Sequence, residues 1–133
     1  MKKSRHVQLI HRILVLIAVL FGLITVIAGT RVLAGSDPGY YVFLPLLLYN
    51  TVMGVAYIVV GIIMWRNTTQ GKYAAASIFG LNFLVLGIVG YLYAAEASVA
   101  VNSVGAMIFR TVIWLVLFLG LTWVYRRKTP AER

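Results

Sequence analysis

The stretch Ile13–Thr30, ILVLIAVLFGLITVIAGT, lies between Arg12 and Arg31 and has no charged residue over 18 positions. An α-helix needs about 20 mostly apolar residues to cross the roughly 30 Å hydrocarbon layer of a bilayer. The stretch has that composition, and it lacks the alternation of apolar and polar residues that a membrane β-barrel strand requires. It therefore predicts a membrane-spanning helix near Leu9–Thr30.

Three further uncharged stretches follow along the chain. They are Pro38–Trp65 with 28 residues, Tyr73–Ala95 with 23 and Thr111–Tyr125 with 15. They predict spans near Leu44–Trp65, Ala74–Ala94 and Ala106–Tyr125. The fourth span is long enough only if it includes Arg110, whose side chain we expect to extend to the lipid head groups from about one turn inside the helix. Four spans with short connections predict an all-α membrane protein, with residues 1–133 as one domain folded as an antiparallel four-helix bundle.

The composition excludes other classes of protein. Hydrophobic residues make up 62% of the chain and charged residues 11%, whereas soluble domains carry about 45–50% apolar and about 25% charged residues. A soluble enzyme and a disordered chain are therefore excluded. The chain has no cysteine, so it has no disulfide and no thiolate ligand for a metal.

The basic residues collect on one side of the predicted bundle. Ten of the 12 lie beside span ends that share this side: Lys2, Lys3, Arg5, Arg12, Arg66, Lys72, Arg126, Arg127, Lys128 and Arg133. Lys and Arg are enriched on the cytoplasmic side of membranes, so we expect both termini in the cytoplasm of a bacterial inner membrane. The net charge of +9 then faces anionic lipid rather than nucleic acid.

A cleaved signal peptide is the competing interpretation of the first apolar stretch. Such peptides carry an apolar region of roughly 7–15 residues, and the stretch that follows Arg12 is longer. We therefore expect it to remain in the protein as the first span.

Glycines recur seven positions apart in three of the predicted spans. Seven residues are about two helical turns, so the two glycines of a pair share one face. The pairs are Gly22 and Gly29, Gly54 and Gly61, and Gly80 and Gly87. Small residues let membrane helices approach closely, so we expect these faces to point into the bundle, against the bulkier fourth span.

Asn82 does not fit that arrangement. It lies about 200° around the third span from Gly80, so a glycine face that points inward turns Asn82 outward toward lipid, which is unfavourable for a polar group. Either Asn82 contacts another subunit, or the third span is rotated and its glycines face outward. We expect this face to mediate a homo-oligomer or to dock on another membrane protein.

Asn50, with Tyr49 and Tyr57, forms the best candidate for a buried polar patch. Hydrogen bonds between helices are one role for it. The alternative is that Asn50 meets the polar head of a quinone or a lipid that enters from the side of the bundle.

The side opposite the termini carries the charges Arg31, Asp37, Glu96 and Arg110. Ion pairs at the rim of the bundle are one interpretation, with Arg110 and Glu96 the favoured pair because both flank the same connection. The alternatives are separate solvation at the membrane surface and a small anion held between Arg31 and Arg110.

The chain offers little for catalysis or metal binding. Its two histidines, His6 and His11, lie at the same end of one span, and no Asp or Glu falls in the middle of a span. Metal and haem sites need more ligands or ligands on facing helices, and ion-coupled pumps normally need a buried ionisable group. We expect no enzyme activity, no metal and no resident cofactor, quinone or lipid excepted.

Two segments resemble the DoxX-like membrane proteins. The first runs from His11–Leu14 through Phe21-Gly22 to Ala28–Arg31 and is similar to their first span. The second comprises Met53–Tyr57, Val60–Ile63 and Arg66, and is similar to their second span and the loop that follows. That family often has an acidic residue early in the second span, where this chain has neutral residues such as Asn50. The resemblance implies a four-helix subunit or accessory protein of a membrane redox complex.

These observations support three functional hypotheses. The first is a non-enzymatic inner-membrane protein that acts as an oligomeric or accessory subunit of a membrane complex. The second is a small transporter or channel between protomers, lined by Asn50, Tyr57 or Asn82. The third is a redox-complex subunit that binds quinone.

Overall fold

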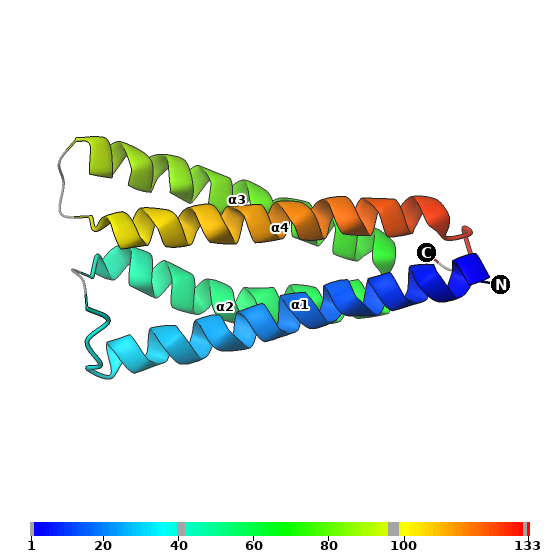
Figure 1. The fold of residues 1–133 in the computed structure, drawn as a ribbon, viewed down its shortest axis with the longest axis horizontal. Helices are drawn as coiled ribbons and strands as arrows, with labels where there is room; N and C mark the ends of the chain where they lie inside the picture. Colours follow the sequence, from blue (N-terminus) through cyan, green and yellow to red (C-terminus); the bar gives the residue numbers. More distant parts are fainter. Residues whose placement is uncertain (1, 40–41, 96–98, 132) are drawn as a thin grey trace.

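The computed structural model describes residues 2–39, 42–95, 99–131 and 133, and in this part of the chain all regular structure is helical (Figure 1). The helices are α1 (Lys2–Leu33), α2 (Leu44–Arg66), α3 (Thr68–Ala94) and α4 (Val101–Arg127). They run up and down in chain order. The predicted all-α bundle of four spans is confirmed.

The two ends of the bundle differ (Figure 1). Both termini and the α2–α3 connection lie at one end, which we call the termini end. The α1–α2 and α3–α4 connections lie at the other, the loop end. At the loop end, Gly35 has a φ of 113°, a conformation that glycine adopts without steric cost, and the chain turns there after α1.

The α2–α3 connection is a single residue. Asn67 is extended, with φ −150°, and it follows α2 and precedes α3 directly. Its side-chain oxygen accepts a hydrogen bond from the backbone N–H of Gln70 at 2.9 Å, which satisfies one donor of the first turn of α3. The third helix therefore begins at Thr68 rather than at the predicted Ala74, because the polar residues after Asn67 extend the helix beyond its apolar part.

The glycines of α1 and α2 lie where these helices cross. A Cβ added at Gly22 would lie 2.7 Å from the carbonyl oxygen of Gly54. One added at Gly61 would lie 2.6 Å from the Cγ2 atom of Val19, and one added at Gly29 would overlap the Thr51 hydroxyl. At Gly22 and Gly54 the two backbones approach closely enough to leave no room for a side chain, whereas Gly29 and Gly61 lie against the side chains of Thr51 and Val19. These glycines therefore pack between α1 and α2, and the expectation that they lie against the fourth span is wrong.

The glycines of α3 lie elsewhere. Gly80 and Gly87 are exposed, and a Cβ added at either has no neighbour within 4 Å. The expectation that the glycines of α3 point into the bundle is wrong. Of the two alternatives for Asn82, the second holds: α3 is rotated so that its glycines face outward and Asn82 faces inward. Asn82 is 0% exposed, because two tyrosines of α2 bind it there.

The interior is aromatic at its centre. Tyr57 lies between Phe21, with ring centroids 5.6 Å apart, and Trp114, with ring centroids 5.0 Å apart. Both Tyr57 and Trp114 are fully buried. A smaller apolar cluster near the loop end comprises Leu46, Val89, Val99 and Met107.

The outer surface is apolar along the length of the helices. Leu, Ile, Val and Phe side chains on all four helices are exposed, and each helix is long and apolar enough to cross a membrane. In a bilayer these side chains contact lipid. The chain is therefore a multi-pass membrane protein.

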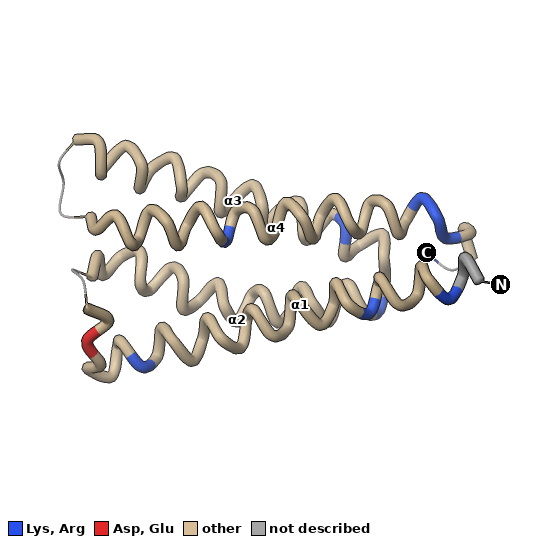
Figure 2. Tube along the Cα trace, viewed as in Figure 1, with Lys and Arg blue, Asp and Glu red and all other residues tan. Residues whose placement is uncertain are grey.

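Charge is distributed unevenly along the bundle axis (Figure 2). Apart from Arg31 on α1 and Arg110 on α4, the described basic residues lie at the termini end. Asp37 lies at the loop end.

Candidate functional site

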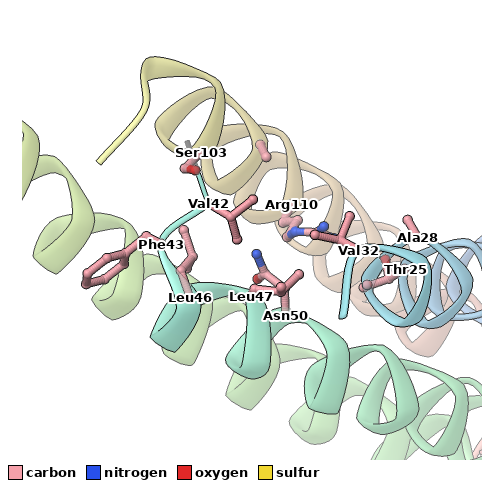
Figure 3. Close-up of a pocket in the computed structure, with 12 residues that line it drawn as sticks. Thr25, Ala28, Val32, Val42, Phe43, Leu46, Leu47, Asn50, Ser103 and Arg110 are labelled. Carbon is pink, nitrogen blue, oxygen red and sulfur yellow. Dashed lines mark hydrogen bonds between the residues drawn. The ribbon is translucent and has the colours of Figure 1, made fainter. Parts of the chain in front are cut away.

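A pocket of about 100 Å³ lies between α1, α2 and α4 near the loop end (Figure 3). We call it the loop-end pocket. Its polar lining consists of Thr25, Asn50, Ser103 and Arg110. Its apolar lining consists of Ala28, Gly29, Val32, Val42, Phe43, Leu46, Leu47 and Ala106.

Arg110 supplies the positive charge of this pocket. It is half-buried, and its Nη1 donates a hydrogen bond to the Thr25 hydroxyl at 3.1 Å. Its guanidinium carbon lies 5.6 Å from the ring centroid of Phe21, within the range of a cation–π contact. Both partners belong to α1, so the side chain crosses from α4 into the bundle.

The expectation that Arg110 extends to the head groups from one turn inside the fourth span is therefore wrong. The helix begins at Val101 rather than at Ala106, so Arg110 is ten residues into it, about 13 Å from its start at 1.5 Å per residue. At that depth Thr25 and Phe21 are closer partners than the surface. Hydropathy shows where the apolar part of a span begins. It does not show where the helix begins, because a helix can start in less apolar residues before that part.

Asn50 lies across the pocket from Arg110. Its side chain extends from α2 into the pocket and points toward Arg110 (Figure 3). Its Oδ1 is buried and has no hydrogen-bond partner among the described residues. A buried polar atom without a partner costs about 1–3 kcal/mol.

The pocket continues toward the surface along an apolar groove. A neighbouring hollow of about 310 Å³ shares Val32, Val42 and Leu47 with it and extends to Pro38 and Leu44. The polar part and the apolar groove together have the form of a site for a molecule with a polar head and an apolar tail.

Tyr49, Tyr57 and Asn82 form a separate cluster. The Tyr49 hydroxyl donates to the Asn82 Oδ1 at 3.0 Å, and the Tyr57 hydroxyl donates to the same oxygen at 3.2 Å. Asn50 lines the loop-end pocket, whereas the hydroxyls of Tyr49 and Tyr57 bind Asn82 of α3. The structure thus divides the predicted polar patch into a tyrosine–asparagine cluster and a pocket residue.

The predicted rim charges are also separated. Arg31 and Asp37 are exposed and do not line the loop-end pocket, and the Asp37 carboxylate accepts a hydrogen bond from the backbone N–H of Gly39 at 2.8 Å. Glu96, the predicted partner of Arg110, lies outside the described residues. Of the two arginines between which an anion was predicted, Arg110 lines the loop-end pocket with Thr25 and Asn50, and Arg31 does not.

Two polar residues of the pocket, Thr25 and Ser103, were not predicted from the sequence. Thr25 lies within the first apolar stretch, and Ser103 lies in the segment between the third and fourth predicted spans. No group of three or more His, Cys, Asp or Glu suited to a metal ion occurs among the described residues.

Comparison with known protein families, with curated proteins and with solved structures gave no match. The function is therefore inferred from the geometry of this chain.

Proposed function

We propose that this protein is a non-enzymatic membrane protein that binds the acidic head group of a membrane amphiphile in the loop-end pocket. The observation that carries the proposal is the position of Arg110, a cation about 13 Å inside α4 that lines a pocket with Asn50 and Thr25. Ionisable residues inside a membrane span are costly to bury and typically mark ligand or ion sites.

The chemistry of the lining supports binding rather than catalysis. Arg110 offers several N–H donors that suit a carboxylate or phosphate, and the amide group of Asn50, which also lines the pocket, adds two N–H donors. The hydroxyls of Thr25 and Ser103 have no Asp, Glu or His beside them among the described residues of the lining. A hydroxyl nucleophile needs such a base for activation.

The size of the pocket supports a small head group with a tail outside it. A polar space of about 100 Å³ is below the roughly 300–1,000 Å³ typical of pockets that enclose a whole small molecule. The hollow beside it, which shares Val32, Val42 and Leu47 and reaches the α1–α2 connection at Ser36 and Pro38, leaves room for an apolar part of the ligand at the mouth of the pocket. This arrangement favours a lipid-like acid over a water-soluble metabolite.

The proposed setting is a bacterial inner membrane with both termini in the cytoplasm. The support is the excess of Lys and Arg at the termini end, since such residues are retained on the cytoplasmic side. The loop-end pocket then lies in the outer half of the bilayer, and its ligand enters from the outer leaflet.

The test is ligand-dependent stability of the purified protein in a mild nonionic detergent. Laurate, an acid with a single chain, should raise the midpoint of thermal unfolding, and dodecanol should not. At one hundred times its Kd a ligand stabilises by about 2.7 kcal/mol. Arg110→Gln should abolish the laurate effect, and the matched control Arg31→Gln, at an exposed position outside the pocket, should retain it.

Equal effects of laurate on the Arg110→Gln variant and on the wild-type protein would contradict the proposal. The quinone hypothesis predicts a different result: a ubiquinone or menaquinone analogue with a short tail raises the midpoint, laurate does not, and organic extraction of the purified protein yields quinone.

A second candidate function, an oligomeric or accessory subunit, is favoured by the outward face of α3. Phe83, Leu84, Gly87, Ile88 and Tyr91 line a shallow hollow of about 410 Å³ there, of a kind into which another membrane helix packs. A second copy bound at this hollow predicts that Ile88→Cys forms a disulfide-linked dimer in membranes and that Val116→Cys, exposed on α4, does not. Equal dimer yields from the two variants would exclude it.

A further inference from the structure

A second polar pocket lies at the termini end, far from the site described above. It has a volume of about 280 Å³ and is lined by Gln8, His11, Arg12, Trp65 and Lys128. We call it the termini-end pocket. These residues come from the beginning of α1, the end of α2 and the residue that follows α4.

Lys128 is held in a fixed position at this pocket. Its Nζ lies 3.0 Å from the His11 Nδ1 and donates a hydrogen bond to the Thr68 hydroxyl at 3.2 Å. The His11 Nε2 lies 2.6 Å from the carbonyl oxygen of Met64. These bonds connect residues of all four helices or their immediate ends, so the position of the ammonium group is set by the fold.

The hydrogen bonds also determine the form of His11. An ammonium group only donates hydrogen bonds, so the His11 Nδ1 is the acceptor and the hydrogen of the ring lies on Nε2, which donates to Met64. His11 is therefore neutral, and the positive charge at this point belongs to Lys128.

The pocket presents two cations at the termini end. Arg12 is exposed and Lys128 is half-buried. Trp65 is 58% exposed, and tryptophan is enriched at the membrane–water interface. Gln8 adds amide N–H donors.

We propose that the termini-end pocket binds the phosphate of an anionic phospholipid between Arg12 and Lys128, with Trp65 beside the upper acyl chain. The pocket lies where α1 begins and α2 ends, and we expect phospholipid head groups at this end of the spans. Basic pockets between membrane helices on the cytoplasmic side bind lipid phosphates in this way. The site is independent of the loop-end pocket and of its ligand.

The test uses fluorescence quenching by brominated lipids in bilayers that contain the full chain. The emission of Trp65 is obtained by subtracting the fluorescence of the Trp65→Phe variant from that of the wild-type protein. At equal mole fraction, brominated phosphatidylglycerol should compete for the position beside Trp65 about thirtyfold better than brominated phosphatidylcholine, as expected for about 1 kcal/mol from each of the two basic residues.

Four variants separate this site from diffuse surface charge. Arg12→Gln should reduce the preference to about fivefold, because Lys128 remains, and Arg12→Lys should restore most of the loss. Arg5→Gln removes a charge from an exposed position of α1 outside the pocket and should leave the preference unchanged. Arg110→Gln should also leave it unchanged, which distinguishes this site from the proposed function.

Two results would overturn the proposal. One is an equal loss of preference in Arg5→Gln and Arg12→Gln, which indicates attraction by the whole basic surface. The other is no preference for phosphatidylglycerol together with thermal stabilisation by inorganic phosphate in phosphatidylcholine bilayers, which indicates a site for free phosphate.

Discussion

At the scale of single residues, buried amide and hydroxyl groups determine how the helices are rotated. Asn82 accepts hydrogen bonds from Tyr49 and Tyr57, which turns α3 so that Gly80 and Gly87 face outward. The sequence showed that Asn82 conflicts with an inward glycine face. It did not show whether Asn82 or the glycines of α3 would face the interior, because the partners of Asn82 lie on another helix.

We predict that Asn82→Leu lowers the free energy of unfolding by about 1–3 kcal/mol, because two tyrosine hydroxyls lose their acceptor inside the bundle. The measurement is unfolding in mixed detergent micelles with rising sodium dodecyl sulfate. The oligomeric state in mild detergent should not change, because the side chain lies inside the bundle.

The control is Asn102→Leu, at an exposed position of α4, which should change the stability by less than about 0.5 kcal/mol. Equal stability of the Asn82→Leu variant and the wild-type protein would show that the hydrogen bonds to Asn82 contribute nothing.

At the scale of helices, apolar stretches predicted the number and approximate position of all four spans. They did not predict where α3 and α4 begin, since Thr68–Lys72 and Val101–Gly105 are helical without being strongly apolar. The depth of Arg110 follows from the start of α4, and so does its place in the pocket. Helix rotation could be predicted for α1 and α2 only, where Gly22 packs against Gly54.

Glycine contacts between α1 and α2 give a prediction with an internal control. Gly22→Ala should destabilise the protein by about 1–3 kcal/mol, because its Cβ would lie 2.7 Å from the carbonyl oxygen of Gly54 and the backbones must move apart. Gly80→Ala should be neutral or stabilise by up to about 1 kcal/mol, since alanine favours the helix and the position is open.

The same unfolding measurement compares the two variants. A larger loss of stability for Gly80→Ala than for Gly22→Ala would mean that α3, and not α1, is the helix whose glycines are packed.

At the scale of the whole molecule, the uneven distribution of charge distinguishes the two ends of the bundle, and each end has its own pocket. The basic residues lie at the termini end with the termini-end pocket, and the cation of the loop-end pocket lies near the other end of the bundle. The charges were readable from the sequence because they interrupt the apolar stretches. The pockets were not, because each is formed by residues of three separate segments of the chain.

The central claim is that the chain crosses the membrane four times and returns both ends to the basic side, which places the loop-end pocket in the opposite leaflet. The chain has no cysteine, so single cysteines can be labelled with a membrane-impermeant maleimide in intact bacterial cells. Ser36→Cys and Asn102→Cys should react in intact cells, and Gln70→Cys and Thr129→Cys should react only after the membrane is permeabilised. Labelling of Thr129→Cys in intact cells, or different accessibility of Ser36→Cys and Asn102→Cys, would contradict the account.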